Sequence, residues 1–288
     1  MNGNLRGILA MTAATSVFIV NDMLMKLVAE TAQPVQAIGV RGVFATLWVG
    51  LALAWSGAWR QLGGLSDGRI VLRTGIEVVG TFAYLLALFH IPIGVATAIN
   101  LAVPLALTAL AVIFLKEDVR WRRWAAVIAG FVGVLLVIRP LPGEFNLWSW
   151  LVLGATFLHA ARDLLTRLVP QRIPSLIITF ATAAAVAIAG CGWAAVQGWQ
   201  PMSSREIGLI ALASVLVAAG YQLVIVAMRV GEVSVVGSFR YSSIVWALLI
   251  GWIVWGEVPD LWGAVGIAII VGSGLYILHR ESVRAERA

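Results

Sequence analysis

Long apolar runs separated by short polar connections extend over almost the whole chain. A helix needs about 20 mostly apolar residues to cross the hydrocarbon of a bilayer. No connection is long enough to hold a soluble domain, so the pattern predicts an all-α polytopic membrane protein. The sequence favours ten transmembrane spans, at residues 6–29, 34–57, 70–90, 93–115, 121–139, 147–169, 174–197, 206–229, 232–254 and 260–279.

A polar motif in the first span returns in the sixth. Asp22 and Lys26 follow Asn21 in the first span, and Asp163 and Arg167 stand 141 positions after them. Each motif places an acid and a base four residues apart near the end of an apolar run, a spacing that brings both side chains onto one helix face. The recurrence predicts that the chain contains two copies of one unit.

Other matches extend the repeat over both halves. At offsets of 140 or 141 positions, Gly80 matches Gly220, Glu117 matches Glu257, and Trp121 matches Trp262. Five spans per copy is an odd number, so the second copy must enter the membrane upside down. Inverted repeats of this kind are typical of secondary transporters, whose substrate site lies near the midplane. We therefore predict two five-helix repeats, residues 1–140 and 141–288.

Composition and charge agree with a membrane location. Hydrophobic residues make up 61% of the chain and charged residues 12%, whereas a soluble domain has about 45–50% and about 25%. Lys and Arg gather in the connections of one side, as in 116–123, whereas the counterpart 257–260 is acidic. This asymmetry predicts that both termini are cytoplasmic. It also accounts for the sequence pI of about 10.2 without a nucleic-acid partner.

Positive support for an enzyme is absent from the sequence. It contains no HExxH and no P-loop motif, so we expect neither catalysis nor a cofactor. His90, His159 and His279 are scattered, which argues against a metal site. Cys191 is the single cysteine, which excludes an internal disulfide and a cysteine-based metal site.

The two acid–base pairs, Asp22 with Lys26 and Asp163 with Arg167, allow two interpretations. As gates, they would lie toward opposite mouths of a cavity and be made and broken alternately. As local ion pairs, they would only offset the cost of their own charges, with Lys26 and Arg167 reaching toward the interface.

Arg240 stands near the middle of the ninth span, where a charge facing lipid would cost at least about 2.5–3.5 kcal/mol. We predict that it faces a cavity or an acid, and Glu77 in the third span is the candidate partner, although Arg73 competes for it. Arg240 would then either anchor an anionic or carbonyl-bearing substrate or form a structural pair. A glutamate paired with Arg240 would stay ionised and be a poor proton carrier.

Polar and aromatic residues at a similar depth suit an organic ligand, since rings can stack and polar groups can orient it. Each of them can equally be a packing residue. We read Arg41, in the outer part of the second span, as a pairing residue. The candidates for substrate contact, besides Arg240, are Tyr84, Asn100, His159, Tyr221, Gln222, Tyr241 and Trp246.

Small residues recur every four positions in the fifth and tenth spans, and faces of this kind let helices approach closely. They indicate helix packing and not a binding site. The residues are Ala125, Ala129 and Gly133 in the fifth span, and Ala264, Ala268 and Gly272 in the tenth.

Several stretches together resemble a known family. They are Pro104, Leu115-Lys116-Glu117, Phe239-Arg240-Tyr241 and Gly256-Glu257-Val258-Pro259-Asp260, with the paired motifs of the first and sixth spans. They are similar to the EamA branch of the drug/metabolite transporter superfamily, and to its bacterial subgroup of riboflavin and S-adenosylmethionine transporters. Lys116 departs from the family pattern, which usually has Gly before the Glu.

The resemblance implies a basket-like bundle in the bacterial inner membrane with a central cavity. We therefore expect a secondary transporter of a small organic metabolite, such as an amino acid derivative or a flavin, that works by alternating access. Its partners would be this metabolite and the lipid bilayer, and the chain would act as a monomer or homodimer. The alternatives are a passive channel or facilitator and, with less support, a membrane-embedded lipid-modifying enzyme.

Overall fold

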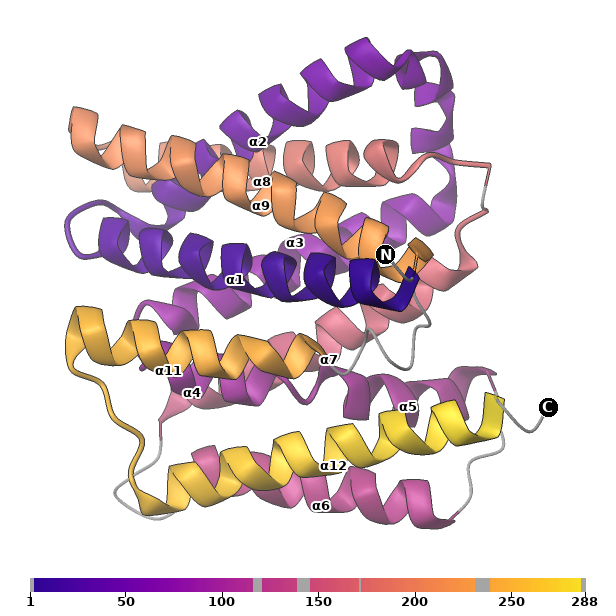
Figure 1. Cartoon of the computed structure of the whole chain (residues 1–288). Helices are drawn as coiled ribbons and strands as arrows, with labels where there is room; N and C mark the ends of the chain where they lie inside the picture. The colour runs from indigo at the N-terminus through magenta and orange to yellow at the C-terminus, as the bar shows by residue number, and fades with distance from the viewer. Residues whose placement is uncertain (1–2, 116–120, 139–145, 171, 231–238, 286–288) are drawn as a thin grey trace.

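The computed structural model describes residues 3–115, 121–138, 146–170, 172–230 and 239–285, and nearly all of these residues are helical (Figure 1). Every predicted span coincides with one or two helices, although residues 232–238 of the ninth span lie outside the described ranges. The helices are α1 (Gly3–Ala29), α2 (Pro34–Ser56), the 3-10 helix η1 (Ala58–Ser66), α3 (Gly68–Leu88), α4 (Ile93–Asn100), α5 (Val103–Leu115), α6 (Trp121–Ile138), α7 (Leu147–Leu168), α8 (Ser175–Gln197), α9 (Ser204–Val230), the 3-10 turn η2 (Phe239–Tyr241), α11 (Ser242–Trp255) and α12 (Leu261–Ala285).

Local sequence signals set several of the helix ends. Ser203 and Glu206 form a capping box at the start of α9, each side chain accepting a hydrogen bond from the other's backbone N–H. The backbone at Gly57 takes the left-handed conformation, with φ of 71°, just after α2, and Gly256 does the same after α11 with φ of 69°. These positions favour glycine because other residues are strained there.

The fourth span is broken in the middle, which the sequence analysis did not predict. Helix α4 ends at Asn100 and α5 begins at Val103. Pro104 explains the break, because proline has no N–H to bond the carbonyl four residues before it and disfavours helical geometry in the preceding residue. Ala102 instead donates to Ile99, a tighter i to i−3 bond. The break leaves the Asn100 side chain at a helix end within the bundle.

Helices of the first repeat pack mainly on helices of the second. The most extensive pairings are α1 with α9, α2 with α8, α3 with α7 and α6 with α12, and α4 also packs on α11. A twofold axis between inverted repeats would generate this set of pairs. It would turn the α1–α9 pair into the α7–α3 pair, and it would exchange the two members of each of the other three pairs. The pairings fit two inverted five-helix repeats whose helices interleave.

Both ends of the described chain lie at the same end of the bundle (Figure 1). Helix α1 runs away from that end, whereas its repeat counterpart α7 runs toward it. Helices α6 and α12 form one edge of the molecule, next to α4 and α5. The remaining helices surround the polar residues described below.

Backbones approach most closely where α2 crosses α8. A Cβ atom added to Gly190 would lie 2.5 Å from Gly39 Cα, and one added to Gly39 would lie 2.6 Å from Cys191 N. One turn further, a Cβ on Gly42 would lie 2.6 Å from Ala187 N. Small residues are therefore required on both faces, and this crossing fixes the neighbouring Arg41.

Candidate functional site

A network of four charged residues joins α3, α7 and η2 inside the bundle. Arg162 Nη1 lies 2.9 Å from Glu77 Oε2, and Arg162 Nη2 lies 2.8 Å from Asp163 Oδ1. Arg240 Nη1 lies 3.9 Å from Asp163 Oδ2. Arg162 therefore bridges two carboxylates, and Asp163 links it to the turn that contains Arg240.

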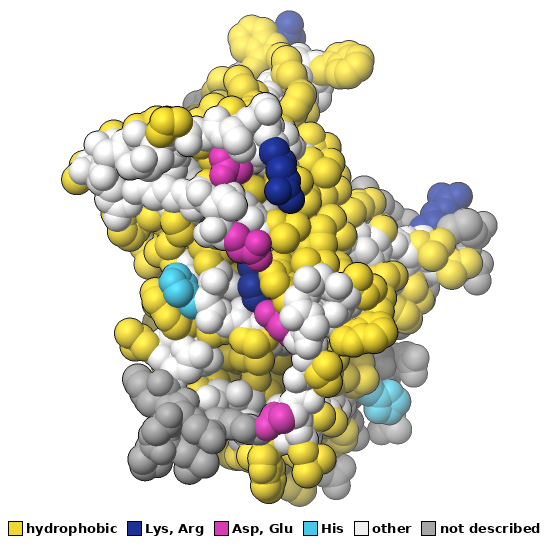
Figure 2. All heavy atoms as spheres, turned by 90° about the vertical axis from the view of Figure 1, so that its left-hand side faces the viewer, with side chains coloured by type: hydrophobic (Ala, Val, Ile, Leu, Met, Phe, Trp, Pro, Cys, Tyr) yellow, Lys and Arg dark blue, Asp and Glu magenta, His cyan; other side chains and the backbone are white. Residues whose placement is uncertain are grey.

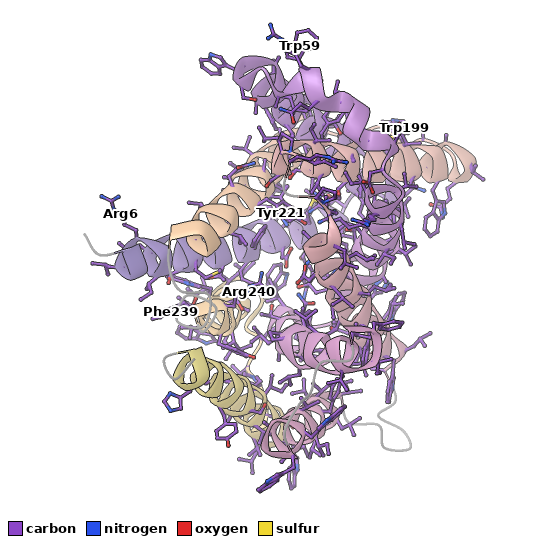
Figure 3. The ribbon with its side chains drawn as sticks, turned by 90° about the vertical axis from the view of Figure 1, so that its right-hand side faces the viewer. Arg6, Trp59, Trp199, Tyr221, Phe239 and Arg240 are labelled. Carbon is purple, nitrogen blue, oxygen red and sulfur yellow. The ribbon has the colours of Figure 1, made fainter. Side chains whose placement is uncertain are left out.

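The predicted pairing of Arg240 with Glu77 is wrong. Glu77 is held by Arg162 and, at 3.7 Å, by Arg73 of the same helix. Arg73 is itself fixed, because it donates to the hydroxyls of Thr166 and Thr182 at 2.9 and 2.8 Å. The sequence analysis overlooked Arg162, which stands beside Asp163 in the repeated motif. Arg240 and Tyr221 lie toward the middle of the ring of helices (Figure 3).

A second polar cluster joins α1, α2 and α3. Tyr84 donates a 3.0 Å hydrogen bond to Asp22 Oδ2, and the Asn21 amide donates to Asp22 Oδ1 at 2.9 Å. The Asn21 carbonyl oxygen in turn accepts a 3.2 Å hydrogen bond from Arg41. Asn21 thus stands between Asp22 and Arg41, which do not form a direct ion pair.

His159 of α7 connects this cluster to the broken helix. Its Nδ1 lies 3.0 Å from Asn100 Oδ1, at the end of α4. Its ring centroid lies 5.9 Å from that of Tyr84. The structure therefore brings Tyr84, Asn100 and His159 together, as the sequence analysis expected of residues that line one site.

Lys26 does not pair with Asp22, so the predicted pair within α1 is wrong. Its ammonium group lies 2.8 Å from Glu257 Oε1, donates to the Ile91 carbonyl at 2.7 Å and lies 4.8 Å from the centre of the Trp255 ring. Glu257 Oε2 accepts the backbone N–H of Ile93 at 3.0 Å. The two residues face the same way on α1, but Lys26 finds a carboxylate and a carbonyl beyond its own helix.

These contacts lie at one end of the bundle. They tie α1 to the start of α4 and to the connection between α11 and α12. Figure 2 looks onto this end, opposite the chain termini, and shows a short row of acidic and basic side chains across its middle. We call the Lys26–Glu257 pair and its bonds to Ile91 and Ile93 the end latch.

Three predicted contact residues lie away from this cluster. Gln222 and Trp246 are exposed, Trp246 by 36%, and make no hydrogen bond to the cluster within the described residues. Tyr241 is buried against α12, where a Cβ atom on Gly274 would overlap its hydroxyl group. The side chain of Arg167 lies outside the described part of the structure, so its pairing with Asp163 stays a prediction.

A small polar cavity of about 70 Å³ lies between α2, α3, α8 and α9. Its volume is roughly that of two water molecules in the liquid, far below the about 300–1,000 Å³ of a typical metabolite pocket. Its polar wall consists of Arg41, Arg73, Glu77, Thr81, Thr179, Thr182 and Tyr221, and the rest of its lining is apolar. The sequence analysis named Tyr221 and Glu77 as site residues but treated Arg41 only as a pairing residue.

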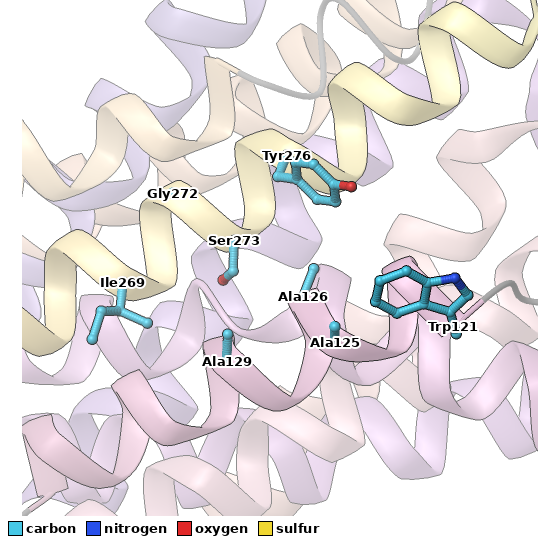
Figure 4. Close-up of a pocket in the computed structure, with 8 residues that line it drawn as sticks. All are labelled: Trp121, Ala125, Ala126, Ala129, Ile269, Gly272, Ser273 and Tyr276. Atoms are coloured by element: carbon cyan, nitrogen blue, oxygen red, sulfur yellow. The ribbon is translucent and has the colours of Figure 1, made fainter.

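A larger hollow of about 530 Å³ lies at the edge of the molecule, between α6 and α12 (Figure 4). Its walls are almost wholly apolar and include Ala125, Ala129 and Gly272 of the small-residue faces. The helices touch deeper in the membrane, where a Cβ on Gly133 would lie 2.8 Å from the Gly266 carbonyl oxygen. The close-packing prediction thus holds at Gly133, whereas Ala125 and Gly272 line a surface hollow.

No group of three or more His, Cys, Asp or Glu residues is arranged to hold a metal ion within the described ranges. The side chains gathered inside the bundle are instead hydrogen-bonding and ion-pairing groups. They can bind and orient a polar organic molecule.

A solved crystal structure aligns with this chain at a TM-score of 0.65 and 17% identity, covering 98% of this chain and 99% of the other, which shows the shared fold. A riboflavin transporter of Vibrio cholerae is 30% identical over 222 residues, 75% of this chain and 73% of the relative. An S-adenosylmethionine uptake transporter of Rickettsia prowazekii is 26% identical over 214 residues, 73% and 71% of the two chains.

A pseudopaline exporter of Pseudomonas aeruginosa is 23% identical over 271 residues, 92% of this chain and 93% of the relative. The relatives thus include both an uptake protein and an exporter. The model of the EamA-like transporter family matches the chain twice, over residues 5–139 and 146–278. The chain therefore belongs to the EamA-like transporter family, in the drug/metabolite transporter superfamily.

Proposed function

We propose that this membrane transporter of small metabolites is a secondary transporter that works by alternating access. The observation that carries the proposal is the network of Glu77, Arg162, Asp163 and Arg240, which joins the first repeat to the second through Glu77 and Arg162 and reaches η2 through Asp163. Charged residues at membrane depth usually line a substrate or ion pathway. A broken helix at this depth, α4–α5, supports the same reading, because transporter sites are typically built at discontinuous helices.

The proposed binding residues are those that the bundle brings to its interior. Arg240, Tyr221, Tyr84, Asn100 and His159 would contact the metabolite directly. Glu77 and Asp163 would hold the arginines in place. Gln222, Trp246 and Tyr241 receive no such role, because two are exposed and the third packs on α12.

The end latch suggests which side is closed. Lys26 and Glu257 belong to opposite repeats, and their contact joins α1, α4 and the α11–α12 connection. Alternating access requires contacts of this kind to break when the cavity opens to that side. We propose that the structure is closed at the latch end and that the latch replaces the Asp22–Lys26 pair as the gate.

The protein would lie in the bacterial inner membrane with both termini in the cytoplasm. The helix ends at Gly3 and Ala285 lie on one side of the bundle, the side on which Lys and Arg are concentrated in the sequence. One copy of the chain contains the whole interior site, so a monomer suffices for transport and a homodimer would hold two pathways. Reporter fusions at the two termini and mass photometry of the purified protein test these two points.

Counterflow in proteoliposomes tests the transport mechanism. Vesicles loaded with unlabelled S-adenosylmethionine or riboflavin would be placed in the labelled compound, and saturable, transient accumulation of label is expected. A passive channel would equilibrate the label without overshoot, which would refute alternating access. Arg240→Ala should abolish the accumulation, whereas Arg60→Ala, in the exposed η1, should not alter it. Wild-type flux in folded Arg240→Ala would remove Arg240 from the site.

A further inference from the structure

Arg41 occupies an unusual position in the wall of the polar cavity between α2, α3, α8 and α9. Only 8% of the residue is exposed. It stands between Gly39 and Gly42, where α2 has almost no clearance from α8. The close crossing holds the α2 backbone beside the cavity, and Arg41 lies in the cavity wall.

The arginines near this cavity differ in how they are neutralised. Arg73 and Arg162 share the Glu77 carboxylate, and Arg162 and Arg240 share Asp163. Arg41 has no carboxylate within 4.0 Å among the described residues. Within the described structure it makes a single hydrogen bond, to Asn21, whose amide lies between it and Asp22.

An arginine has five N–H donors in a planar fork that matches a carboxylate or phosphate group. One donor of Arg41 is used within the described structure, and the group is buried without a direct counter-ion. Such a charge is costly at membrane depth unless a partner compensates it. The cavity in front of it has room for roughly two water molecules, which is enough for an anionic group but not for a whole metabolite.

We propose that Arg41 is the anion-binding residue of this cavity, and that the transported metabolite carries a carboxylate or phosphate group that binds there. The proposal rests on the proposed transport function and names the substrate class. Thr81 and Tyr221 line the same cavity. The Thr81 hydroxyl group would donate a further hydrogen bond to the anion, whereas the Tyr221 hydroxyl group donates to Glu77 Oε1 at 3.4 Å. The rest of the metabolite would extend toward Tyr84 and His159 when the bundle opens.

Two matched ligand pairs test the proposal on the wild-type protein. S-adenosylmethionine differs from its decarboxylated form by one carboxylate, and flavin mononucleotide differs from riboflavin by one phosphate. In at least one pair, we expect the member that carries the additional carboxylate or phosphate to bind about tenfold or more tightly than its partner, as for a charge-assisted bidentate contact. Isothermal titration of the purified protein in detergent gives the two Kd ratios, and the pair with the larger ratio identifies carboxylate or phosphate. Equal affinity within both pairs would overturn the proposal.

Two variants then assign the effect to Arg41. Arg41→Gln should lower the Kd ratio to about one while leaving the affinity for the uncharged or decarboxylated member in place. Arg41→Lys keeps the charge but not the fork and should retain part of the ratio. Arg60→Gln is the matched control on the exposed η1. A full ratio in folded Arg41→Gln, judged by gel filtration, would refute the role of Arg41. If the protein binds the carboxylate- or phosphate-bearing ligand selectively but shows no counterflow in vesicles, the transport mechanism would be refuted and the role of Arg41 in binding would stand.

Discussion

Lys26 of α1 and Glu257 of the α11–α12 connection lie 2.8 Å apart, although 231 positions separate them in the chain. The pair joins the two repeats at the end of the bundle that faces away from both termini. Its bonds to the backbone at Ile91 and Ile93 hold the start of α4 in the same assembly. If the transporter works as proposed, the strength of this contact should set how readily that end of the bundle opens.

Removal of the latch should open that end. We expect Glu257→Gln, and more so Lys26→Met, to speed the labelling of a cysteine at Thr97 by a membrane-impermeant maleimide added from the latch side. Thr97 is buried in α4, one turn beyond Ile93. Cys191→Ser provides a cysteine-free background, because the chain has one cysteine.

The control for the latch is Glu30→Gln, which neutralises an exposed carboxylate that accepts a hydrogen bond from Trp255 at the same end. It should leave the labelling rate unchanged. The double variant Lys26→Met with Glu257→Gln should label as fast as Lys26→Met alone. It should unfold at a higher temperature than Lys26→Met, because it does not leave the partly buried Glu257 carboxylate without its cation. Labelling at the wild-type rate in all latch variants would show that other contacts close this end.

Arg162→Gln should be among the most damaging single substitutions. It leaves Glu77 without its nearest cation and removes the bridge to Asp163. Breaking a buried ion pair by removing one partner typically costs about 3–5 kcal/mol. We expect a marked drop in the unfolding temperature in detergent and loss of counterflow. Arg69→Gln, which loses an exposed bond to the Leu168 carbonyl, should change neither measurement, and an equal drop in both variants would contradict the central role of Arg162.

The two aspartates of the repeated motif should respond differently to neutralisation. Asp163 contacts Arg162 and Arg240, whereas Asp22 accepts hydrogen bonds from Tyr84 and Asn21. Asp163→Asn leaves two arginines with reduced compensation, so it should lower the unfolding temperature more than Asp22→Asn. The two substitutions should also shift cysteine accessibility of the two cavity mouths in opposite directions. Identical shifts would show that the two motifs do not act as counterparts.

Gly190→Ala should destabilise the protein by about 1–3 kcal/mol, as expected for overpacking. The new methyl group would overlap the Gly39 backbone. Gly192→Ala, two residues along α8, meets nothing within 4 Å, and should be neutral or slightly stabilising because alanine favours helix. Scanning fluorimetry of the two variants measures the difference. Equal melting temperatures would show that α2 and α8 separate easily.

The sequence predicted the spans and the repeat because both depend on local composition and on positions that can be counted. It failed where side chains reach between helices. The four-residue spacing of Asp22 and Lys26 favours a pair within α1, yet Lys26 contacts Glu257 of the other repeat. The matching positions of Glu117 and Glu257 indicate that an acid recurs in both repeats. A repeat offset shows which residues occupy equivalent positions, but it does not show which residues contact each other.

The break after Asn100 and the position of Arg162 both have signals in the sequence. Pro104 could have predicted the break after Asn100, since a proline inside a helix removes a backbone bond. Arg162 aligns with Asn21 in the repeated motif, and the structure places both between other charged groups. The position of Arg41 could not be predicted, because it depends on which helix α2 packs against. That pairing with α8 is visible only in three dimensions.

The interleaving of the repeats has a consequence for how the protein is made. Helix α1 enters the bilayer early in synthesis, but its main neighbour α9 and the Glu257 partner of Lys26 are translated much later. Until then, the ammonium group of Lys26 and the guanidinium group of Arg41 must be hydrated or held at the interface, because lipid cannot pair with them. The first half alone would therefore be a poor folding unit, and assembly of the bundle would wait for the last helices to leave the ribosome.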